Sequence, residues 1–152
     1  MKSREVPDWH TYFMELAHSI AKRSKDPTSQ HGAVIVDSGN RIIATGYNGV
    51  PAGFPDDMTD WTPGMTGTGC DWTIHAEENA LLYAGQRASK GATMYVTGRP
   101  CPRCLLRIIQ CGIIRVVCGE ATYPSSADDA ETFARIAALS GIRVRYHNLP
   151  LE

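Results

Sequence analysis

The sequence has no long hydrophobic run and no strong excess of charge of either sign. No apolar segment approaches the roughly 20 residues needed to cross a bilayer, and residues 1–7 carry no apolar signal segment. Fifteen Lys and Arg residues stand against 16 Asp and Glu residues, for a net charge of −1, and no basic stripe is present. We therefore expect no membrane partner and no nucleic acid as the main partner.

Internal repeats and low-complexity tails are also absent. The 152 residues, 43% of them hydrophobic, suffice for one compact domain spanning 1–152 and not for two. The five cysteines are an odd number, and two of them have a metal-type spacing. This pattern suits a reducing compartment better than secretion, so we predict a cytoplasmic protein.

Two short motifs carry the chemistry, His75-Ala76-Glu77 and Pro100-Cys101-Pro102-Arg103-Cys104. Together they match the H-x-E…P-C-x-x-C signature of zinc-dependent nucleobase deaminases. One imidazole and two thiolates would leave the fourth position of a tetrahedral zinc open, as a catalytic site requires. A water in that position has a pKa of about 7. The motifs therefore predict one catalytic zinc per chain, held by His75, Cys101 and Cys104, with Glu77 as the general acid and base.

The spacing of these residues constrains where they sit. Residues two apart on a helix point about 200° from each other, so His75 and Glu77 can address one metal only from a helix N-terminus. Thr73 is the predicted cap of that helix. Pro102 suits a first helical position, which makes Cys101 the predicted cap of a second helix. The sequence predicts two helix starts facing one metal.

Each motif alone has a less specific interpretation. A C-x-x-C motif between a strand and a helix is also typical of thiol–disulfide oxidoreductases, and His-x-Glu by itself is common on surfaces. Their combination, with Pro100 before the first cysteine, favours the metal site. Of the other cysteines, Cys111 and Cys118 lie on apolar stretches and are predicted to be small buried side chains. Cys70, in a Gly-rich loop, is taken as structural.

Hydrophobic periodicity predicts the elements of the fold. Residues 48–72 show no periodicity and many Gly and Pro residues, as expected of a long functional loop. Elsewhere the predicted order is a helix ending near 23, a hairpin of strands 33–36 and 42–45, a helix over 75–84, a strand at 93–97, a helix opened by Pro102 and closed by Gly112, a strand at 113–117, a helix at 128–140 and a short strand at 144–146. This order predicts one mixed sheet covered by helices on both faces.

Nearly the whole chain resembles the deoxycytidylate (dCMP) deaminases of the cytidine deaminase superfamily. The likeness covers residues 7–14, 24–36, 46–53, 75–80 and 108–113. It departs at His31, where the family usually carries a branched aliphatic residue, and at Cys111, where Ala is frequent. The extra Cys and His residues with which some members bind a second, structural zinc are not evident. The resemblance implies a cytidine deaminase-like three-layer α/β/α sandwich with a mixed central sheet.

The resemblance also implies an activity, the hydrolytic deamination of dCMP to dUMP and ammonia, which supplies dUMP for dTMP synthesis. The implied substrate-binding residues are Ser24, Lys25 and Ser29 near the 5′-phosphate, Asn48 at the deoxyribose, and Ala76 and Tyr123. From the residues alone, Lys25-Asp26 would instead be a solvated turn, and Asn48 a turn residue before Gly49.

Regulation is implied by the same resemblance. Family members assemble as homohexamers that dCTP with Mg²⁺ activates and dTTP inhibits. The implied effector site comprises Asn48, Gly49, Pro51, Gly53, Phe54, Asp57 and Asn79. The alternative for residues 48–53 is a loop that only closes over the substrate.

Two other hypotheses stay open. One is another deaminase of the superfamily, acting on tRNA adenosine or a free base, against which the near-neutral charge and residues 46–53 count. The other is a non-catalytic, zinc-stabilised nucleotide-sensing module, which would have no need of Glu77 beside the metal.

Overall fold

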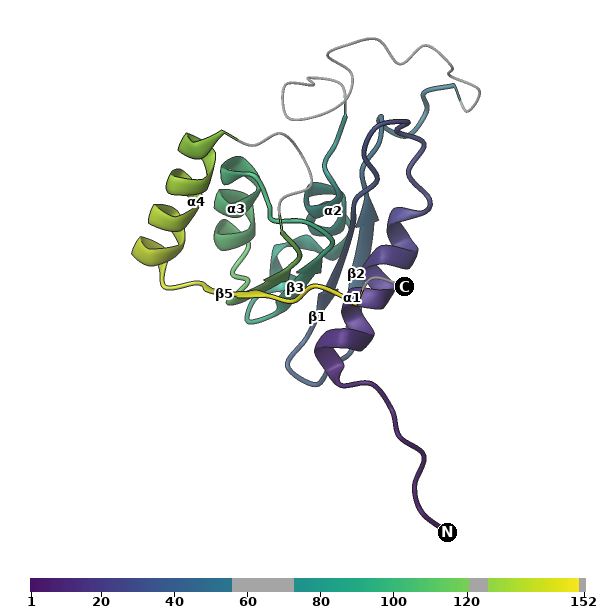
Figure 1. Cartoon of the computed structure of the whole chain (residues 1–152). Coiled ribbons are helices and arrows are strands. Elements are labelled where there is room, and N and C mark those ends of the chain that lie inside the picture. Colours follow the sequence, from purple (N-terminus) through teal and green to yellow (C-terminus); the bar gives the residue numbers. More distant parts are fainter. Residues whose placement is uncertain (56–72, 121–125, 151–152) are drawn as a thin grey trace.

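The computed structural model describes residues 1–55, 73–120 and 126–150. Asp57, Cys70 and Tyr123, singled out in the sequence, lie outside these ranges. The elements in chain order are α1 (Trp9–Ala21), β1 (Gly32–Val36), β2 (Ile42–Tyr47), α2 (Ala76–Ser89), β3 (Thr93–Val96), α3 (Pro102–Gln110), β4 (Arg115–Cys118), α4 (Ala127–Ser140) and β5 (Arg143–Tyr146) (Figure 1).

Five strands form one mixed sheet in the order β2-β1-β3-β4-β5. The hairpin strand β1 is antiparallel to both β2 and β3, whereas β3, β4 and β5 run parallel. Ala33 of β1 lies opposite Val96 of β3, and Val96 in turn lies opposite Cys118 of β4. The mixed sheet predicted from the order of elements is confirmed.

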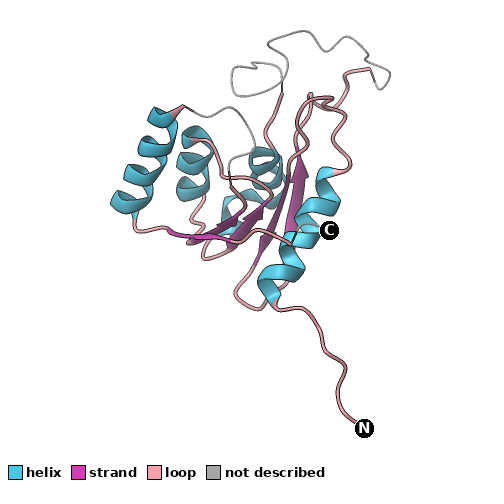
Figure 2. Ribbon diagram, in the orientation of Figure 1, coloured by secondary structure: helices cyan, strands magenta, loops and turns pink. Residues whose placement is uncertain are grey.

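Helices cover both faces of this sheet (Figure 2). On one face, Phe13, Met14 and Ala17 of α1 pack against Val34 and Val36 of β1. On the other face, α2, α3 and α4 contribute the buried side chains Ala76, Ala80, Leu81, Leu105, Ile108 and Phe133. All five residues of β1 are buried because the strand has helices on both sides. The predicted three-layer α/β/α sandwich is confirmed.

Local sequence signals set several helix ends. Asp8 caps α1 by accepting hydrogen bonds from the N–H groups of His10 (3.0 Å) and Thr11 (3.1 Å). Gly141 ends α4 in the left-handed conformation (φ 74°), as its place after residues 128–140 predicted. Helix α1 ends at Ala21, two residues before the predicted end, and Lys22 caps it.

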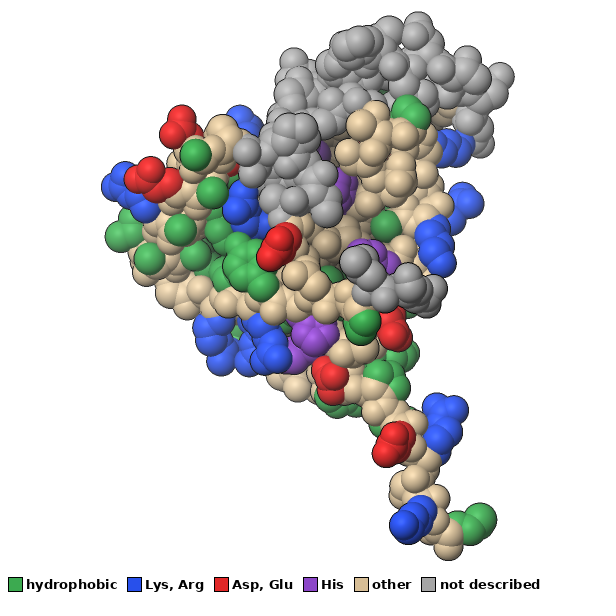
Figure 3. Space-filling model, viewed as in Figure 1, with side chains coloured by type: hydrophobic (Ala, Val, Ile, Leu, Met, Phe, Trp, Pro, Cys, Tyr) green, Lys and Arg blue, Asp and Glu red, His purple; other side chains and the backbone are tan. Residues whose placement is uncertain are grey.

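The surface agrees with the near-neutral charge. On the face shown in Figure 3, Lys and Arg side chains form separate groups rather than one continuous stripe. Within the described ranges, no helix combines the length and the apolar character that crossing a membrane requires. Of the two cysteines predicted to be buried, Cys118 is fully buried and Cys111, the C-cap of α3, is half-buried.

Candidate active site

The start of α2 is fixed by its own first turn and by a neighbouring helix. His75 is the N-cap (φ −69°, ψ 156°), so the expectation that Thr73 caps this helix is wrong. The physical reason is that Glu78, at the third helical position, accepts a hydrogen bond from the His75 N–H at 3.0 Å. Glu78 also pairs with Arg107 of α3 at 2.5 Å. These contacts tie the segment carrying His75 to the helix that carries the cysteines.

Strand β2 determines how closely α2 packs against the sheet. A Cβ atom placed on Gly46 would lie 2.3 Å from the Ala76 carbonyl oxygen and 2.4 Å from the Ala80 nitrogen. Only glycine allows the helix backbone to approach the strand this closely. Gly46 therefore positions the helix turn in which Ala76 and Glu77 follow the cap.

The start of α3 is built from the second motif. Cys101 is the N-cap, Pro102 occupies the first helical position, and the Cys101 Sγ accepts the Cys104 N–H at 3.4 Å. This start lies just beyond the carboxyl end of β3, where α/β sheets commonly place ligands. Sequence analysis predicted this cap, and the structure confirms it.

The two helix starts face each other and bring three ligand atoms together. His75 Nδ1 lies 3.7 Å from Cys101 Sγ and 3.4 Å from Cys104 Sγ, and all three atoms lie within 4.8 Å of one another. Bond lengths of about 2.05 Å to nitrogen and about 2.3 Å to sulfur would place tetrahedral zinc ligands about 3.6 Å apart (nitrogen to sulfur) and about 3.8 Å apart (sulfur to sulfur). The group therefore fits a zinc ion.

Hydrogen bonds within this cluster set the protonation of its members. A hydrogen bond from the Cys104 thiol, and another with His75, lower the pKa of Cys101 to about 4. Its hydrogen bond with Cys101 raises the pKa of His75 to about 9. Donation to Cys101, together with burial, raises the pKa of the Cys104 thiol. Two cysteine sulfurs and one histidine nitrogen form a donor set that prefers zinc over hard cations, and metal binding would release the protons of His75 and Cys104.

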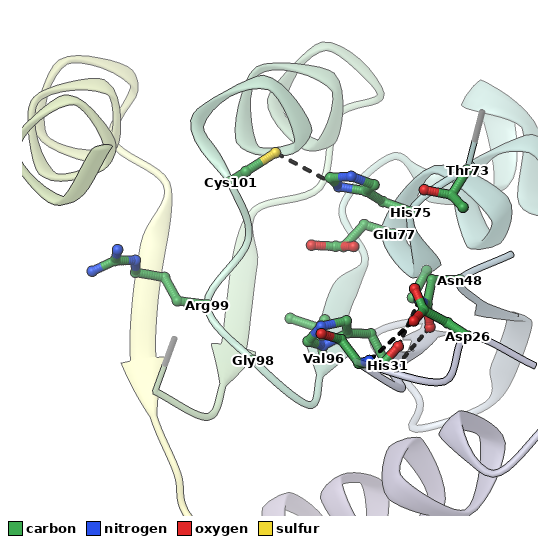
Figure 4. A pocket seen from close by; sticks show the side chains of 12 residues that line it. Asp26, His31, Asn48, Thr73, His75, Glu77, Val96, Gly98, Arg99 and Cys101 are labelled. Carbon is green, nitrogen blue, oxygen red and sulfur yellow. Dashed lines mark hydrogen bonds between the residues drawn. The ribbon is translucent and has the colours of Figure 1, made fainter. Parts of the chain in front are cut away.

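Glu77 lies next to the ligand group but is not part of it. Its side chain is only 6% exposed, and burial raises the pKa of its carboxyl to about 7. Figure 4 shows this carboxyl pointing into the cavity beside the ring of His75. A carboxyl with this pKa can both donate and accept a proton near neutral pH, which general acid–base catalysis requires.

A cavity joins this cluster to residues from the first third of the chain. Its lining, shown in Figure 4, comprises Asp26, Ser29, His31, Asn48, Thr73, His75, Ala76, Glu77, Val96, Gly98, Arg99 and Cys101. Of the residues implied by the family resemblance, the cavity brings Ser29, Asn48 and Ala76 beside the ligand group. Ser24 and Lys25 are not among its lining residues.

The segment over residues 26–31 is held in place by Asn48. The Asn48 Nδ2 donates to the Ser29 carbonyl oxygen at 2.9 Å, and its Oδ1 accepts the His31 N–H at 2.7 Å. Asp26, 3% exposed, accepts the N–H groups of Thr28 (2.8 Å) and Ser29 (3.1 Å). The interpretation of Lys25-Asp26 as a solvated turn is therefore wrong for Asp26, which is a buried anchor.

A second hollow lies beside the first and holds most of the implied effector residues. Its lining is Arg23, Lys25 and residues 47–55, which include Gly49, Pro51, Gly53 and Phe54. Asn79 borders this segment and donates to the Tyr47 carbonyl oxygen at 2.8 Å. Ser24 lines neither hollow, and its hydroxyl donates to the carbonyl oxygen of Asn48, which lines both, at 2.8 Å.

Four polar residues that line the first cavity had no predicted role in the site, namely Asp26, His31, Thr73 and Arg99. For Asp26 a signal was present, because Asp-Pro-Thr-Ser is a pattern in which the carboxylate accepts the N–H groups of the following residues. His31 was visible only as a departure from the resembled family. Thr73 and Arg99 each stand two positions before a predicted ligand, His75 and Cys101, but no role in the cavity was inferred from that nearness.

Comparison with known proteins gives consistent results. Residues 7–120 match the family model of the cytidine and deoxycytidylate deaminase zinc-binding region. The deoxycytidylate deaminase of Homo sapiens is 39% identical over 147 residues, covering 95% of this chain and 82% of that protein. The deoxycytidylate deaminase of Mycobacterium phage D29 is 41% identical over 121 residues, covering 73% and 94% respectively. The crystal structure of the dCMP deaminase from cyanophage S-TIM5 in apo form superposes with a TM-score of 0.70 at 25% identity, covering 94% of this chain and 100% of that chain.

Proposed function

The chain belongs to the cytidine and deoxycytidylate deaminase family, and we propose that it hydrolyses dCMP to dUMP and ammonia. The observation that carries this proposal is the group of His75 Nδ1 and two cysteine sulfurs at zinc-ligand distances, with the Glu77 carboxyl in the same cavity. The activity named for its relatives supports dCMP as the substrate. We place the reaction in the cytoplasm, where the thiols stay reduced and the product dUMP serves dTMP synthesis.

His75, Cys101 and Cys104 would hold one zinc ion per chain. Zinc bound there would supply Lewis-acid chemistry, lowering the pKa of a water to about 7 so that a nucleophile exists at neutral pH. The Glu77 carboxyl then moves protons, first to N3 of the pyrimidine and later to the departing amine. Its burial and its pKa of about 7 leave it able to do both.

The surrounding residues would orient the nucleotide. Asn48 has committed its amide hydrogens within the protein, but its Oδ1 keeps a second lone pair for a deoxyribose hydroxyl. We assign Ala76 and Ser29 to contacts in the cavity that they line. Ser24, Lys25 and Ser29 are assigned to the 5′-phosphate of the substrate, and Tyr123 is assigned to a contact with the substrate, as the resemblance implies.

Regulation by nucleoside triphosphates is the second element of the proposal. The hollow lined by Arg23, Lys25 and residues 47–55 offers the Arg23 guanidinium and the backbone of Gly49 and Gly53 to a triphosphate, whose charge Mg²⁺ would offset. Gly49 and Ile74 exchange hydrogen bonds of 3.1 and 2.8 Å, which link this hollow to the residue before His75. A ligand bound in the hollow would thereby change the position of His75. We propose activation by dCTP and inhibition by dTTP in a homohexamer, with Asp57 completing the effector site.

One experiment tests the activity directly. Purified protein should contain one zinc per chain and release ammonia from dCMP, with a much lower kcat/KM for deoxycytidine because the 5′-phosphate is missing. Adenosine-containing RNA and free cytosine or guanine complete the panel. Preference for RNA or a free base would transfer the assignment to another deaminase of the superfamily, and zinc content without ammonia release from any substrate would indicate a sensing module.

A further inference from the structure

We propose that His31 binds the base of the nucleotide by packing the plane of its imidazole against it. This inference rests on the proposed function and assigns a role that the catalytic residues do not fill. It is carried by the position of His31 in the cavity, by the rigidity of its backbone and by the lack of a hydrogen-bonding role within the described protein.

The position of His31 follows from the sheet. His31 precedes β1, and because side chains alternate along a strand it faces the same side as Ala33, which packs beneath α2. Val96, the partner of Ala33 on β3, lines the cavity beside it. Figure 4 shows His31 and Val96 across the cavity from His75 and Glu77. A flat base that lies over Val96 in the cavity, within reach of Glu77, would therefore contact the ring of His31.

The backbone of His31 is fixed at both of its polar groups. Its N–H donates to the Asn48 Oδ1 at 2.7 Å, and its carbonyl oxygen accepts the Asn48 N–H at 3.3 Å. Asp26 anchors the preceding turn through its buried carboxylate. A backbone held in this way keeps the Cα and Cβ of His31 at a fixed place beside the cavity, which favours a defined contact with a ligand.

The ring of His31 makes no hydrogen bond to the residues at 1–55, 73–120 or 126–150. By contrast, the His10 Nδ1 lies 2.9 Å from the Tyr95 hydroxyl, an ordinary structural arrangement. The imidazole of His31 is half-buried and borders the cavity. Because it makes no polar contact within the described residues, it is available to a ligand. Its flat face matches a pyrimidine, since aromatic groups prefer offset stacked or edge-to-face contacts.

Removing a side chain that stacks on a base weakens binding by roughly 5- to 100-fold. We therefore compare His31→Phe, which keeps a flat ring without nitrogens, with His31→Asn, which keeps polar atoms without the ring, and with His31→Ala. The measurements are kcat/KM for dCMP and the dissociation constant of dUMP. Zinc content and thermal melting are recorded for each variant, and His18→Ala on the exposed side of α1 is the control.

The expected result is a retained affinity, within about threefold, for His31→Phe and the control, and a loss of roughly 5- to 100-fold for both His31→Asn and His31→Ala. The loss should fall on KM more than on kcat. Inhibition by deoxyribose 5-phosphate, which lacks a base, should be equal in wild type and His31→Ala. This comparison of wild type with His31→Ala still tests whether His31 contacts the base if His31→Phe fails to fold.

Three outcomes would overturn the inference. The first is that His31→Asn keeps the affinity for dUMP and His31→Phe loses it, and the second is that His31→Ala leaves this affinity unchanged. The third is that His31→Ala weakens the binding of deoxyribose 5-phosphate as much as that of dUMP. Wild-type protein that neither binds dUMP nor deaminates dCMP would refute the proposed function itself. The two failures are therefore distinguishable.

Discussion

Replacing Gly46 with alanine should disable the active site, because the added methyl group would displace helix α2. In Gly46→Ala the new Cβ would lie 2.3 Å from the Ala76 carbonyl oxygen, 2.4 Å from the Ala80 nitrogen and 3.0 Å from the Asn79 carbonyl carbon. All three are backbone atoms of α2, so no side-chain rotation relieves the clash. Ordinary contacts of this kind begin near 3.4 Å. Helix α2 must therefore move away from β2 by about 1 Å.

The size of the effect follows from this displacement. Overpacking of this kind costs about 1–3 kcal/mol of folding free energy. The larger consequence concerns activity, because the displaced turn carries His75 and Glu77 while Cys101 and Cys104 stay on α3. A misplacement of about 1 Å can cost about 100-fold in rate. We expect a loss of kcat/KM of that order, together with weaker zinc binding.

Gly32→Ala is the matched control. Its Cβ would lie 2.0 Å from the Ala17 carbonyl oxygen and 2.7 Å from the Ala21 nitrogen, so the clash is similar but displaces α1, which carries no metal ligand. Both variants should melt at lower temperature. Only Gly46→Ala should lose zinc to a chelator faster than wild type. If Gly46→Ala holds zinc as tightly as wild type and deaminates within threefold of its rate, the reasoning is refuted.

Three further predictions concern the chemistry and its control. Glu77→Gln should keep its zinc and its affinity for dUMP but lose about 100- to 10,000-fold in kcat, since only proton transfer is removed; a rate within tenfold of wild type would contradict the role given to Glu77. Cys104→Ser should bind less than one zinc per chain and lose ammonia release, measured by metal analysis and a coupled assay, whereas Cys111→Ser at the end of α3 should keep both. The dCMP saturation curve should be sigmoidal alone, hyperbolic with dCTP and suppressed by dTTP; a hyperbolic curve indifferent to both would make residues 48–53 a lid. If dCTP raises the affinity for dCMP, dCMP must raise the affinity for dCTP by the same factor.

The sequence by itself determined the features that depend on neighbours along the chain. Pro102 before Cys104 predicted both the helix start and the capping role of Cys101, because a proline suits only the first turn. The spacing of His75 and Glu77 placed them at a helix N-terminus for the same local reason. Branched apolar strands between helices predicted the mixed sheet with two covered faces.

Only the tertiary structure decided which distant residues share the cavity. Asn48 binds the backbone of His31, 17 positions away, and this contact holds residues 26–31 in the cavity that His75 and Cys101 also line. Gly46 beneath α2 and Arg107 beside Glu78 hold the start of α2 against the sheet and against α3. Such contacts form between segments brought together by the sheet. Propensity and spacing, which act within one turn or one strand, carry no information about them.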